Sequence, residues 1–167
     1  MTPPAAPAPE TTCRMVIAMQ ATRAAVPCAR QTLRAGLRHW ALPRDLTADV
    51  LLAASEVLAN AVVHGCALAG PASEVTLTAS RVGRSVRVEV HDPSPVLPLA
   101  KPVRVGDDAE EGRGLALVSA FTDRWGVKLD ADRAGKTVWL EADLPAPAAT
   151  AAASASVPSA GQSGGLR

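Results

Sequence analysis

Three polar side chains recur at helical spacing in an otherwise apolar stretch of this chain. Glu56, Asn60 and His64 follow one another at intervals of four residues within positions 45–64. Side chains four apart lie on one face of an α-helix, so these three form a single stripe. A carboxylate can accept a proton from a hydroxyl group or water, and an amide oxygen suits Mg²⁺. The stripe is either a ligand-facing surface or a set of internal hydrogen bonds to neighbouring backbone.

A carboxylate continues the pattern of a buried strand. Asp92 has the same parity as Val86, Val88 and Val90, so it points with them toward the core if the strand persists. A buried carboxylate needs hydrogen-bond donors, and the exocyclic amine of an adenine ring is one such donor. In the alternative interpretation, Pro93 turns the chain and Asp92 faces water.

A glycine pair stands at the start of another apolar helical segment. Gly112 and Gly114 flank Arg113. Backbone amides at a helix start, unshielded by side chains, can bind phosphate oxygens. An ordinary turn would use the same glycines, and a solvated arginine is the alternative to a phosphate contact at Arg113.

The elements that must position these residues follow from hydrophobic periodicity. Alternation predicts strands, and spacing of three to four predicts helices. The strands are expected at about 12–19, 74–81, 85–91, 125–130 and 136–143, and the helices at about 22–39, 45–64 and 112–121. The strands 74–81 and 85–91 are expected to form a hairpin. The Pro-rich segment 93–112 is either a lid or binding loop or a surface insertion.

These elements predict an α+β fold with one domain. We expect a two-layer α/β sandwich, in which helices cover one face of a mixed, mainly antiparallel sheet. Positions 1–11 and 145–167 are rich in Pro, Ala and Ser. Such segments cannot bury enough apolar surface to offset their ordering entropy, so both are predicted to be disordered tails. The domain is therefore expected at 12–144.

Composition limits the classes of function. The chain has 17 basic and 16 acidic residues, and its aromatic residues are one Phe and three Trp. Nucleic-acid-binding domains usually carry a basic stripe or stacking aromatics, so we expect no direct nucleic-acid partner. We expect no membrane partner either, since no uninterrupted apolar run approaches the ~20 residues of a membrane span. Three cysteines without C-x-x-C spacing favour reduced thiols and a cytoplasmic location.

The order of these motifs resembles one superfamily. It is the histidine kinase-like ATPase superfamily, which has the Bergerat-type ATP-binding fold and includes gyrase, a heat-shock chaperone, histidine kinases and mismatch-repair ATPases. The motifs are Glu56-x-x-x-Asn60-Ala-x-x-His64, Asp92-Pro-Ser, Gly112-Arg-Gly-Leu and Gly135-Lys-Thr-Val-Trp139. Within the superfamily, residues 12–144 are similar to the small anti-sigma-factor serine kinases.

The resemblance implies a role for each matching residue. Glu56 would be the general base, Asn60 would hold Mg²⁺, and Asp92 would bind the adenine amine. The ATP-binding set implied is Asn60, His64, Asp92, Gly112, Arg113, Gly114 and Thr137. The implied partners are ATP, a sigma factor and an anti-anti-sigma antagonist that is phosphorylated on serine. A homodimer is also implied.

Three departures from the family pattern leave the activity open. Both glycines of the usual D-x-G-x-G are replaced in Asp92-Pro-Ser-Pro-Val, and Glu110 stands at the first glycine of the lid. Parity also places Lys136, rather than Thr137, on the face of the apolar residues in the last strand. Two functions remain: an ATP-dependent serine kinase that regulates a sigma factor, and a nucleotide-gated binding module with little or no kinase activity. An interaction domain that has lost ATP is a third, disfavoured by the retention of Glu56, Asn60 and Asp92.

Overall fold

The computed structural model describes residues 11–66, 72–97, 113–131 and 135–146. Five strands and three α-helices are formed by these residues, together with one π-helical turn. In chain order they are β1 Thr11–Gln20, α1 Ala25–His39, α2 Arg44–Asn60, the π-helical turn η1 Ala61–Gly65, β2 Glu74–Val82, β3 Ser85–Asp92, α3 Arg113–Phe121, β4 Arg124–Asp130 and β5 Gly135–Asp143.

The strands form one sheet in the order β1-β2-β3-β5-β4. Every neighbouring pair is antiparallel, so the described sheet lacks the parallel component that the sequence allowed. A tight turn at Gly83 joins β2 and β3 as the predicted hairpin. Gly83 has a φ of 57°, which a glycine adopts without the steric cost of a side chain.

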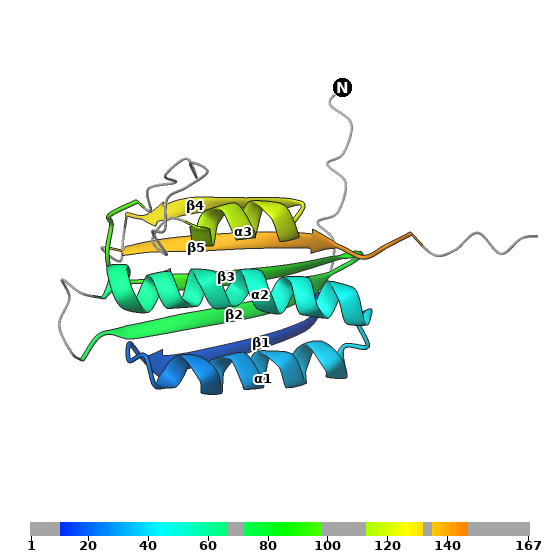
Figure 1. Ribbon diagram of the computed structural model, residues 1–167, viewed down its shortest axis with the longest axis horizontal. Coiled ribbons are helices and arrows are strands. Elements are labelled where there is room, and N and C mark those ends of the chain that lie inside the picture. Colours follow the sequence, from blue (N-terminus) through cyan, green and yellow to red (C-terminus); the bar gives the residue numbers. More distant parts are fainter. Residues whose placement is uncertain (1–10, 67–71, 98–112, 132–134, 147–167) are drawn as a thin grey trace, which may run out of the picture.

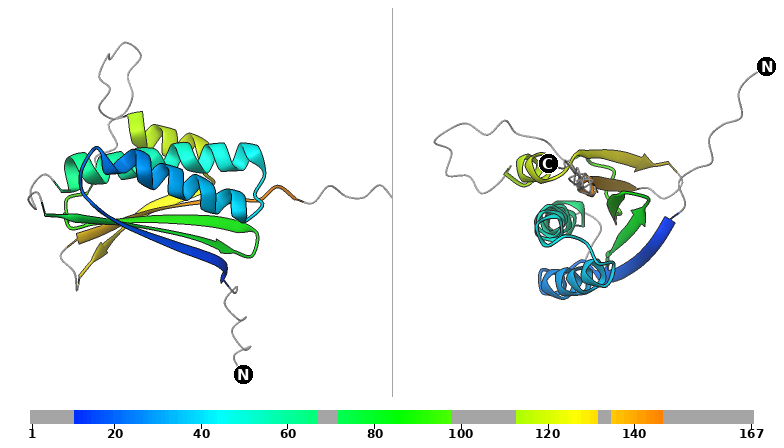
Figure 2. Two further views of the ribbon diagram at one scale, coloured as in Figure 1. Left: turned by 90° about the horizontal axis from the view of Figure 1, so that it is seen from below. Right: turned by 90° about the vertical axis from the view of Figure 1, so that its right-hand side faces the viewer.

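All three helices cover the same face of the sheet (Figures 1 and 2). The helix α2 lies between α1 and α3, so its sides contact both neighbours. This arrangement confirms the predicted α+β two-layer sandwich. It also places α2 over the centre of the sheet, where β3 and β5 pair.

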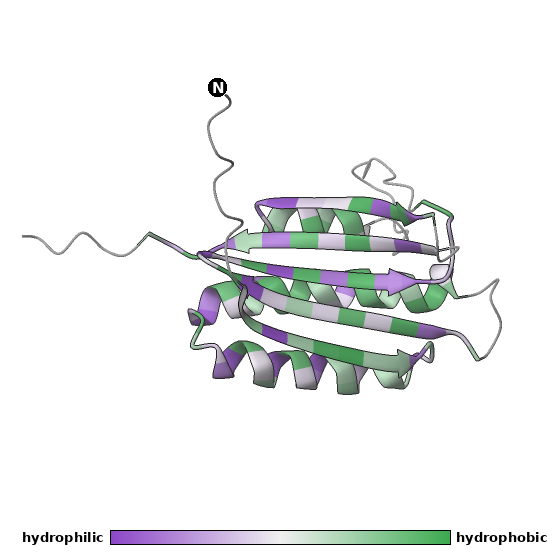
Figure 3. Cartoon of the chain, turned by 180° about the vertical axis from the view of Figure 1, so that it is seen from behind, coloured by the Kyte–Doolittle hydropathy of each residue, from purple (hydrophilic) through white to green (hydrophobic). Residues whose placement is uncertain are grey.

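Alternation along the strands explains which face carries the helices. In β3, every second residue is buried against the helices, and the residues between them are partly exposed. The opposite face of the sheet consequently shows alternating polar and apolar bands (Figure 3). The fully buried core side chains include Leu33 and Leu37 of α1, Val50 and Leu58 of α2, Leu77 of β2, Val86, Val88 and Val90 of β3, Val118 of α3 and Leu140 of β5.

The helix boundaries differ from the prediction in two places. The helix α1 begins at Ala25 rather than 22, because Thr22 forms the preceding turn and accepts a hydrogen bond from the Ala25 amide. The helix α2 begins at Arg44, one residue before the predicted start, so Asp45 lies in its first turn. A carboxylate in the first turn still favours the helix through its dipole.

The helical segment Arg44–Gly65 is long and apolar enough to cross a membrane by length and composition alone, with a mean hydropathy of 1.6 in its most apolar window. Charged residues interrupt this segment in the sequence, so the search for an uninterrupted apolar run did not identify it. In the fold it is the central core helix, and Val50, Ala53 and Val57 are buried against the rest of the domain. The predicted tails lie outside the described residues except for Thr11, which begins β1, and residues 145–146.

Candidate functional site

The polar stripe of α2 faces the first turn of α3. Glu56 and Asn60 are each partly buried, and neither hydrogen-bonds another described residue. A Cβ at Gly114 would lie 3.0 Å from Asn60 Nδ2 and 3.3 Å from Glu56 Oε2. The glycine therefore lets the start of α3 approach both polar groups. The alternative of internal hydrogen bonds to neighbouring backbone is not realised for these two side chains within the described part of the chain.

The last turn of the long helix is wider than an α-helix. The Cys66 amide donates to the Ala61 carbonyl at 3.0 Å, which closes a turn of five residues. Such π-turns change the direction of the side chains that follow them and are frequent at functional sites. His64 lies in this turn and is exposed, without a hydrogen bond to a described residue. The prediction that His64 continues the stripe assumed a regular α-helix, whereas His64 lies in the π-helical turn that follows α2. Its nucleotide role stays a prediction.

The π-helical turn lies directly against the end of β3. A Cβ at Gly65 would be only 2.4 Å from Asp92 Cγ. Gly65 does not have a positive φ, so its glycine is explained by this close approach and not by a helix C-cap. Because Gly65 lies one turn beyond Asn60, Asp92 and the polar stripe are at the same end of the helix layer.

Asp92 is fully buried, and its two oxygens have different surroundings. Asp92 Oδ1 accepts hydrogen bonds from Lys136 Nζ at 2.8 Å and from the Ser94 amide at 3.0 Å. Asp92 Oδ2 is buried and has no hydrogen-bond partner among the described residues. The inward orientation predicted by parity is confirmed, since Asp92 has an exposed fraction of 0%. Because buried polar atoms are normally hydrogen-bonded, this oxygen can accept a hydrogen bond from a ligand.

Lys136 was not among the predicted site residues. Strand register pairs it directly with Asp92 across β3 and β5, so both side chains lie on the helix-covered face. Lys136 is buried, with an exposed fraction of 5%, and its Nζ also donates to the Ser94 carbonyl at 3.0 Å. Parity indicated its face in the sequence, but only the cross-strand register identifies its partner.

Thr137 lies on the other face of the sheet. Its hydroxyl donates to Asp130 Oδ2 at 3.3 Å, and His91 Nε2 lies 3.2 Å from the same oxygen. The His91 and Asp130 atoms are close enough for an ion pair but are not aligned as a hydrogen bond. Thr137 is therefore separated from Asp92 by the sheet, because successive residues of a strand alternate between its faces. The structure therefore does not place the Thr137 hydroxyl beside Asp92, and its nucleotide role stays a prediction.

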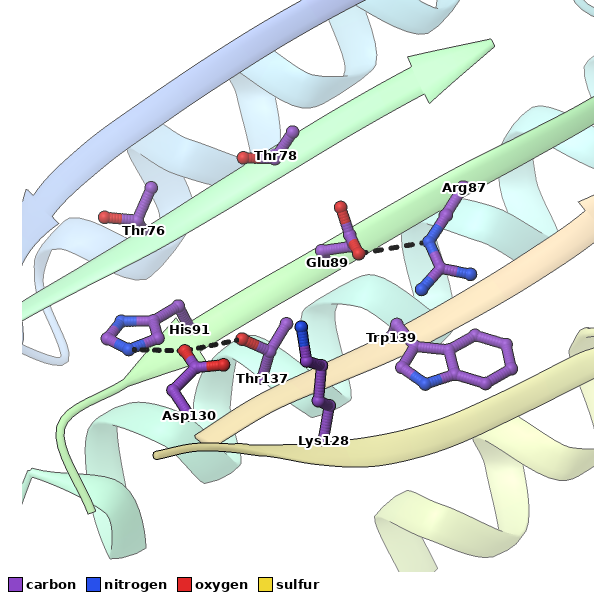
Figure 4. Close-up of a pocket in the computed structure, with 9 residues that line it drawn as sticks. All are labelled: Thr76, Thr78, Arg87, Glu89, His91, Lys128, Asp130, Thr137 and Trp139. Carbon is purple, nitrogen blue, oxygen red and sulfur yellow. Dashed lines mark hydrogen bonds and ion pairs between the residues drawn. The ribbon is translucent and has the colours of Figure 1, made fainter. Parts of the chain in front are cut away.

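That opposite face has a polar hollow of its own, of about 240 Å³ (Figure 4). It contains the His91, Asp130 and Thr137 cluster at one end. At the other end, the Arg87 guanidinium lies 4.4 Å from the centroid of the Trp139 ring. This hollow and the Asp92 site are on opposite sides of the sheet, so they are separate features.

The structure does not describe Gly112 or the side chain of Arg113, which are two further predicted site residues. Gly112 lies outside the described residues, as does Glu110 of the predicted lid. Arg113 begins α3, but only its backbone is described. The structure thus brings together Glu56, Asn60 and Gly114 at the helix junction, with Asp92 beside the adjoining turn.

The comparisons with known proteins agree with this geometry. A family model for the histidine kinase-like ATPase domain matches residues 19–142, which is most of the chain. The chain belongs to the histidine kinase-like ATPase family. Membership of this family implies nucleotide binding.

Solved structures show the same fold in other family-like domains. The crystal structure of the RsbU and RsbW domains of Rv1364c from Mycobacterium tuberculosis matches with a TM-score of 0.60 and 26% identity, covering 80% of this chain and 32% of that one. A chain of the SiaB–SiaC complex from Pseudomonas aeruginosa matches with a TM-score of 0.52 and 15% identity, covering 77% of this chain and 88% of that one. The second likeness is one of fold alone.

One curated relative is similar over a shorter stretch. The uncharacterized protein SCO4941 of Streptomyces coelicolor is 44% identical over 64 residues, which are 38% of this chain and 60% of that protein. The matched segment therefore spans less than two thirds of the relative.

The residues of this family member fit an adenine nucleotide. The orphaned Asp92 Oδ2 requires one donor, which an exocyclic amine supplies. The side-chain-free position at Gly114 leaves the first turn of α3 open beside Asn60. Among the described residues, no group of three His, Cys, Asp or Glu side chains could hold a metal ion by itself. The role of Asn60 with Mg²⁺ therefore stays a prediction.

Replacing Gly114 by alanine is expected to separate ligand binding from folding. The added Cβ would meet the flexible ends of Asn60 and Glu56, which can move, and alanine favours a helix over glycine by up to about 1 kcal/mol. We expect a melting temperature within about 4 °C of the parent, and a roughly tenfold weaker affinity for ATP because the Asn60 amide is displaced. Calorimetric titration and thermal unfolding measure the two effects. The control is Ala120→Ser, which changes an exposed residue of the same helix. A large loss of stability in Gly114→Ala with an unchanged ATP affinity would contradict the expectation.

Proposed function

We propose that this protein binds ATP with Mg²⁺ and is an anti-sigma factor with serine kinase activity toward an anti-anti-sigma antagonist. The observation that carries the proposal is the proximity of a buried carboxylate with one free oxygen to the polar stripe of α2, in a member of the histidine kinase-like ATPase family. The similarity to a chain that contains an RsbW domain supports the same class of function.

Each candidate site residue has a defined task in this proposal. Asp92 Oδ2 accepts a hydrogen bond from the adenine amine. Asn60 supplies an amide oxygen to Mg²⁺, and the first turn of α3 offers backbone amides to phosphate oxygens. Bound ATP supplies the phosphoryl group, and Mg²⁺ offsets the charge of its phosphates.

Glu56 is proposed as the general base. Its carboxylate lies one helical turn before Asn60 and faces the start of α3. It would accept the proton of the antagonist's serine hydroxyl as the serine oxygen bonds to the transferred phosphorus and the bond to ADP breaks. A carboxylate without a hydrogen-bond partner among the described residues is free to take this proton.

The cellular setting completes the proposal. We place the protein in the cytoplasm, where its three free thiols stay reduced, and propose that it forms a homodimer. The sigma factor that it sequesters and the antagonist that it phosphorylates are the protein partners of the proposal. Neither a nucleic acid nor a membrane is required by it.

A nucleotide-gated binding module is the second candidate. The pairing of Asp92 with Lys136, together with Ser94 and Val96 in place of the family glycines, favours it. The Ser94 amide and the Asp92 carboxylate close a short turn that fixes the chain beside the base. A rigid turn on the adenine side of the site favours slow exchange of the bound nucleotide over repeated catalytic turnover. The two candidates differ in phosphotransfer and agree in ATP binding.

The proposal is tested by titrating the protein with ATP in the presence of Mg²⁺ and then assaying transfer of labelled phosphate to candidate antagonists. Binding accompanied by serine phosphorylation supports the kinase. Binding with no transfer to any antagonist that forms a complex supports the gated module. If the protein binds no adenine nucleotide, both candidate functions are wrong.

Changing Glu56 to alanine should separate these candidates further. We expect ATP affinity to stay within about threefold and phosphotransfer to fall by about 10²–10⁴, the usual contribution of a positioned base. Single-turnover phosphotransfer measures the loss, and calorimetry measures the affinity. Asp49→Asn, which alters a carboxylate two turns earlier on α2, is the matched control. If Glu56→Ala abolished ATP binding as well, Glu56 would be a structural residue of the site.

A further inference from the structure

Lys136 is an unusual residue for its position. It follows Gly135 at the start of β5 and pairs directly with Asp92 of β3. Its ammonium is almost completely enclosed, which is costly unless a carboxylate and further acceptors surround it. Asp92 Oδ1 at 2.8 Å and the Ser94 carbonyl at 3.0 Å provide two acceptors. The pair is therefore a built feature of the interior and not a surface contact.

The pair leaves Asp92 in a particular state. Both donors that reach Asp92, the Lys136 ammonium and the Ser94 amide, contact the same oxygen. The second oxygen, Oδ2, is buried and without a partner among the described residues. A cation at Oδ1 favours the ionised carboxylate, and two hydrogen bonds fix its rotation. Oδ2 is thus held as an acceptor in one direction.

We propose that Lys136 is a positioning residue of the nucleotide site, which acts through Asp92 by orienting that carboxylate so that Oδ2 accepts a hydrogen bond from the exocyclic amine of the base. This inference rests on the proposed ATP binding. The lysine contacts Asp92 and not the reacting atoms.

The titratable groups near Asp92 do not replace the positive charge of Lys136. Cys66 lies near both charges, and burial raises the pKa of its thiol, with Asp92 adding to the rise and Lys136 opposing it. The thiol consequently stays neutral at physiological pH and supplies no compensating charge. His91 is on the other face of the sheet, where its ring is beside Asp130. His64 in the π-helical turn is exposed. Among the described residues, Lys136 is the cation that faces Asp92.

The decisive experiment measures ATP affinity by calorimetry for Lys136→Met, which keeps most of the length of the side chain and removes its charge. Without the ammonium, Asp92 Oδ1 loses one of its two donors, so the carboxylate is no longer held with Oδ2 directed toward the base. We expect an ATP affinity about 30-fold below that of the parent. Lys136→Arg retains the charge, so we expect it to bind ATP more tightly than Lys136→Met does.

A second probe separates orientation of Asp92 from a general effect on the fold. Purine riboside triphosphate lacks the exocyclic amine, so it makes no use of Oδ2. We expect the parent to bind it about 30-fold more weakly than ATP, and Lys136→Met to bind the two nucleotides with similar affinity. Lys128→Met is the matched control, since Lys128 is an exposed lysine at the hollow on the opposite face. It should leave the ATP affinity and the discrimination between the two nucleotides unchanged.

Thermal unfolding tests the pair without any nucleotide. Removing one member strands a buried charge, so Lys136→Met and Asp92→Asn should each lower the melting temperature by about 10 °C. The double variant Asp92→Asn/Lys136→Met should be closer to the parent than the sum of the two single losses.

The outcomes distinguish this inference from the function on which it rests. If the parent binds no ATP, the proposed function fails and the role of Lys136 in binding fails with it. If the parent binds ATP and Lys136→Met binds it equally well, the proposed function stands and the positioning role is overturned. The positioning role is upheld by weakened ATP binding in Lys136→Met together with lost discrimination between the two nucleotides.

Discussion

Asp92→Asn is expected to weaken ATP binding by about 100-fold, the loss of one hydrogen bond to a charged group together with a new repulsion. The Lys136 ammonium and the Ser94 amide both donate to the position of Oδ1. They will hold the oxygen of an asparagine amide there. The NH₂ group must then occupy the position of Oδ2, where it presents a donor to the amine of the base. Calorimetric titration with ATP measures the change.

The same substitution tests the buried ion pair. Asparagine leaves the Lys136 charge without its counter-charge, and breaking a buried pair in this way costs about 3–5 kcal/mol. Urea unfolding, followed by circular dichroism, measures this cost and shows whether the variant is folded when it is titrated. Asp130→Asn is the control, because Asp130 is a carboxylate on the opposite face of the same sheet. An ATP affinity equal to that of the parent would remove Asp92 from the nucleotide site.

Gly65→Ala is expected to destabilise the domain by about 3 kcal/mol, at the upper part of the range for overpacked interiors. The new Cβ would lie 2.4 Å from Asp92 Cγ. Asp92 cannot rotate away cheaply, because Lys136 and Ser94 fix its carboxylate in the interior. Either the π-helical turn or the end of β3 must move. ATP affinity should fall as well, since both movements displace Asp92. Urea unfolding gives the first quantity and calorimetry the second.

A second glycine provides a stringent control for this prediction. A Cβ at Gly36 would also approach another atom to 2.4 Å, but that atom is Met15 Sδ. A methionine side chain is unbranched and adaptable, and alanine is the better helix former by about 1 kcal/mol. Gly36→Ala should therefore change stability by no more than about 1 kcal/mol. Equal losses at positions 36 and 65 would show that contact distance alone, and not the rigidity of Asp92, sets the cost.

The two predictions share one physical basis. The proposed adenine side of the nucleotide site lies where three backbone segments meet: the π-helical turn, the end of β3 and the start of β5. Asp92 is the common contact of all three, through Gly65 and Lys136. A change in any one segment is transmitted to the orientation of a single carboxylate. For this reason, binding of the adenine ring should be more sensitive to substitution here than binding of the phosphates at α3.

Much of the fold was available from the sequence because burial and periodicity are coupled. Val86, Val88 and Val90 alternate with polar residues, and such a pattern has one stable placement on a half-covered sheet. The strands agree with the prediction to within one or two residues, and the helices cover one face as expected. The inward direction of Asp92 followed from the same parity.

The π-helical turn is an example of what the sequence did not reveal. A π-turn and an α-turn differ by one residue in the span of a backbone hydrogen bond, here between Cys66 and Ala61. The side-chain pattern of residues 61–65 fits either geometry. Regular helical spacing therefore assigned His64 to the stripe. The contact with Asp92 decides the geometry, and that contact is long-range.

By itself, the sequence determined the layered fold, the family, the stripe of Glu56 and Asn60 and the burial of Asp92, because these depend on local spacing and on the parity of neighbouring residues. The tertiary structure alone decided that Lys136 is the partner of Asp92, that Gly65 makes room for it, and that Thr137 belongs to the opposite face. Those facts depend on which residues of β3 and β5 are paired, across 44 positions of sequence in the case of Asp92 and Lys136. Register of this kind is set by the packing of the whole sheet, and no local pattern encodes it.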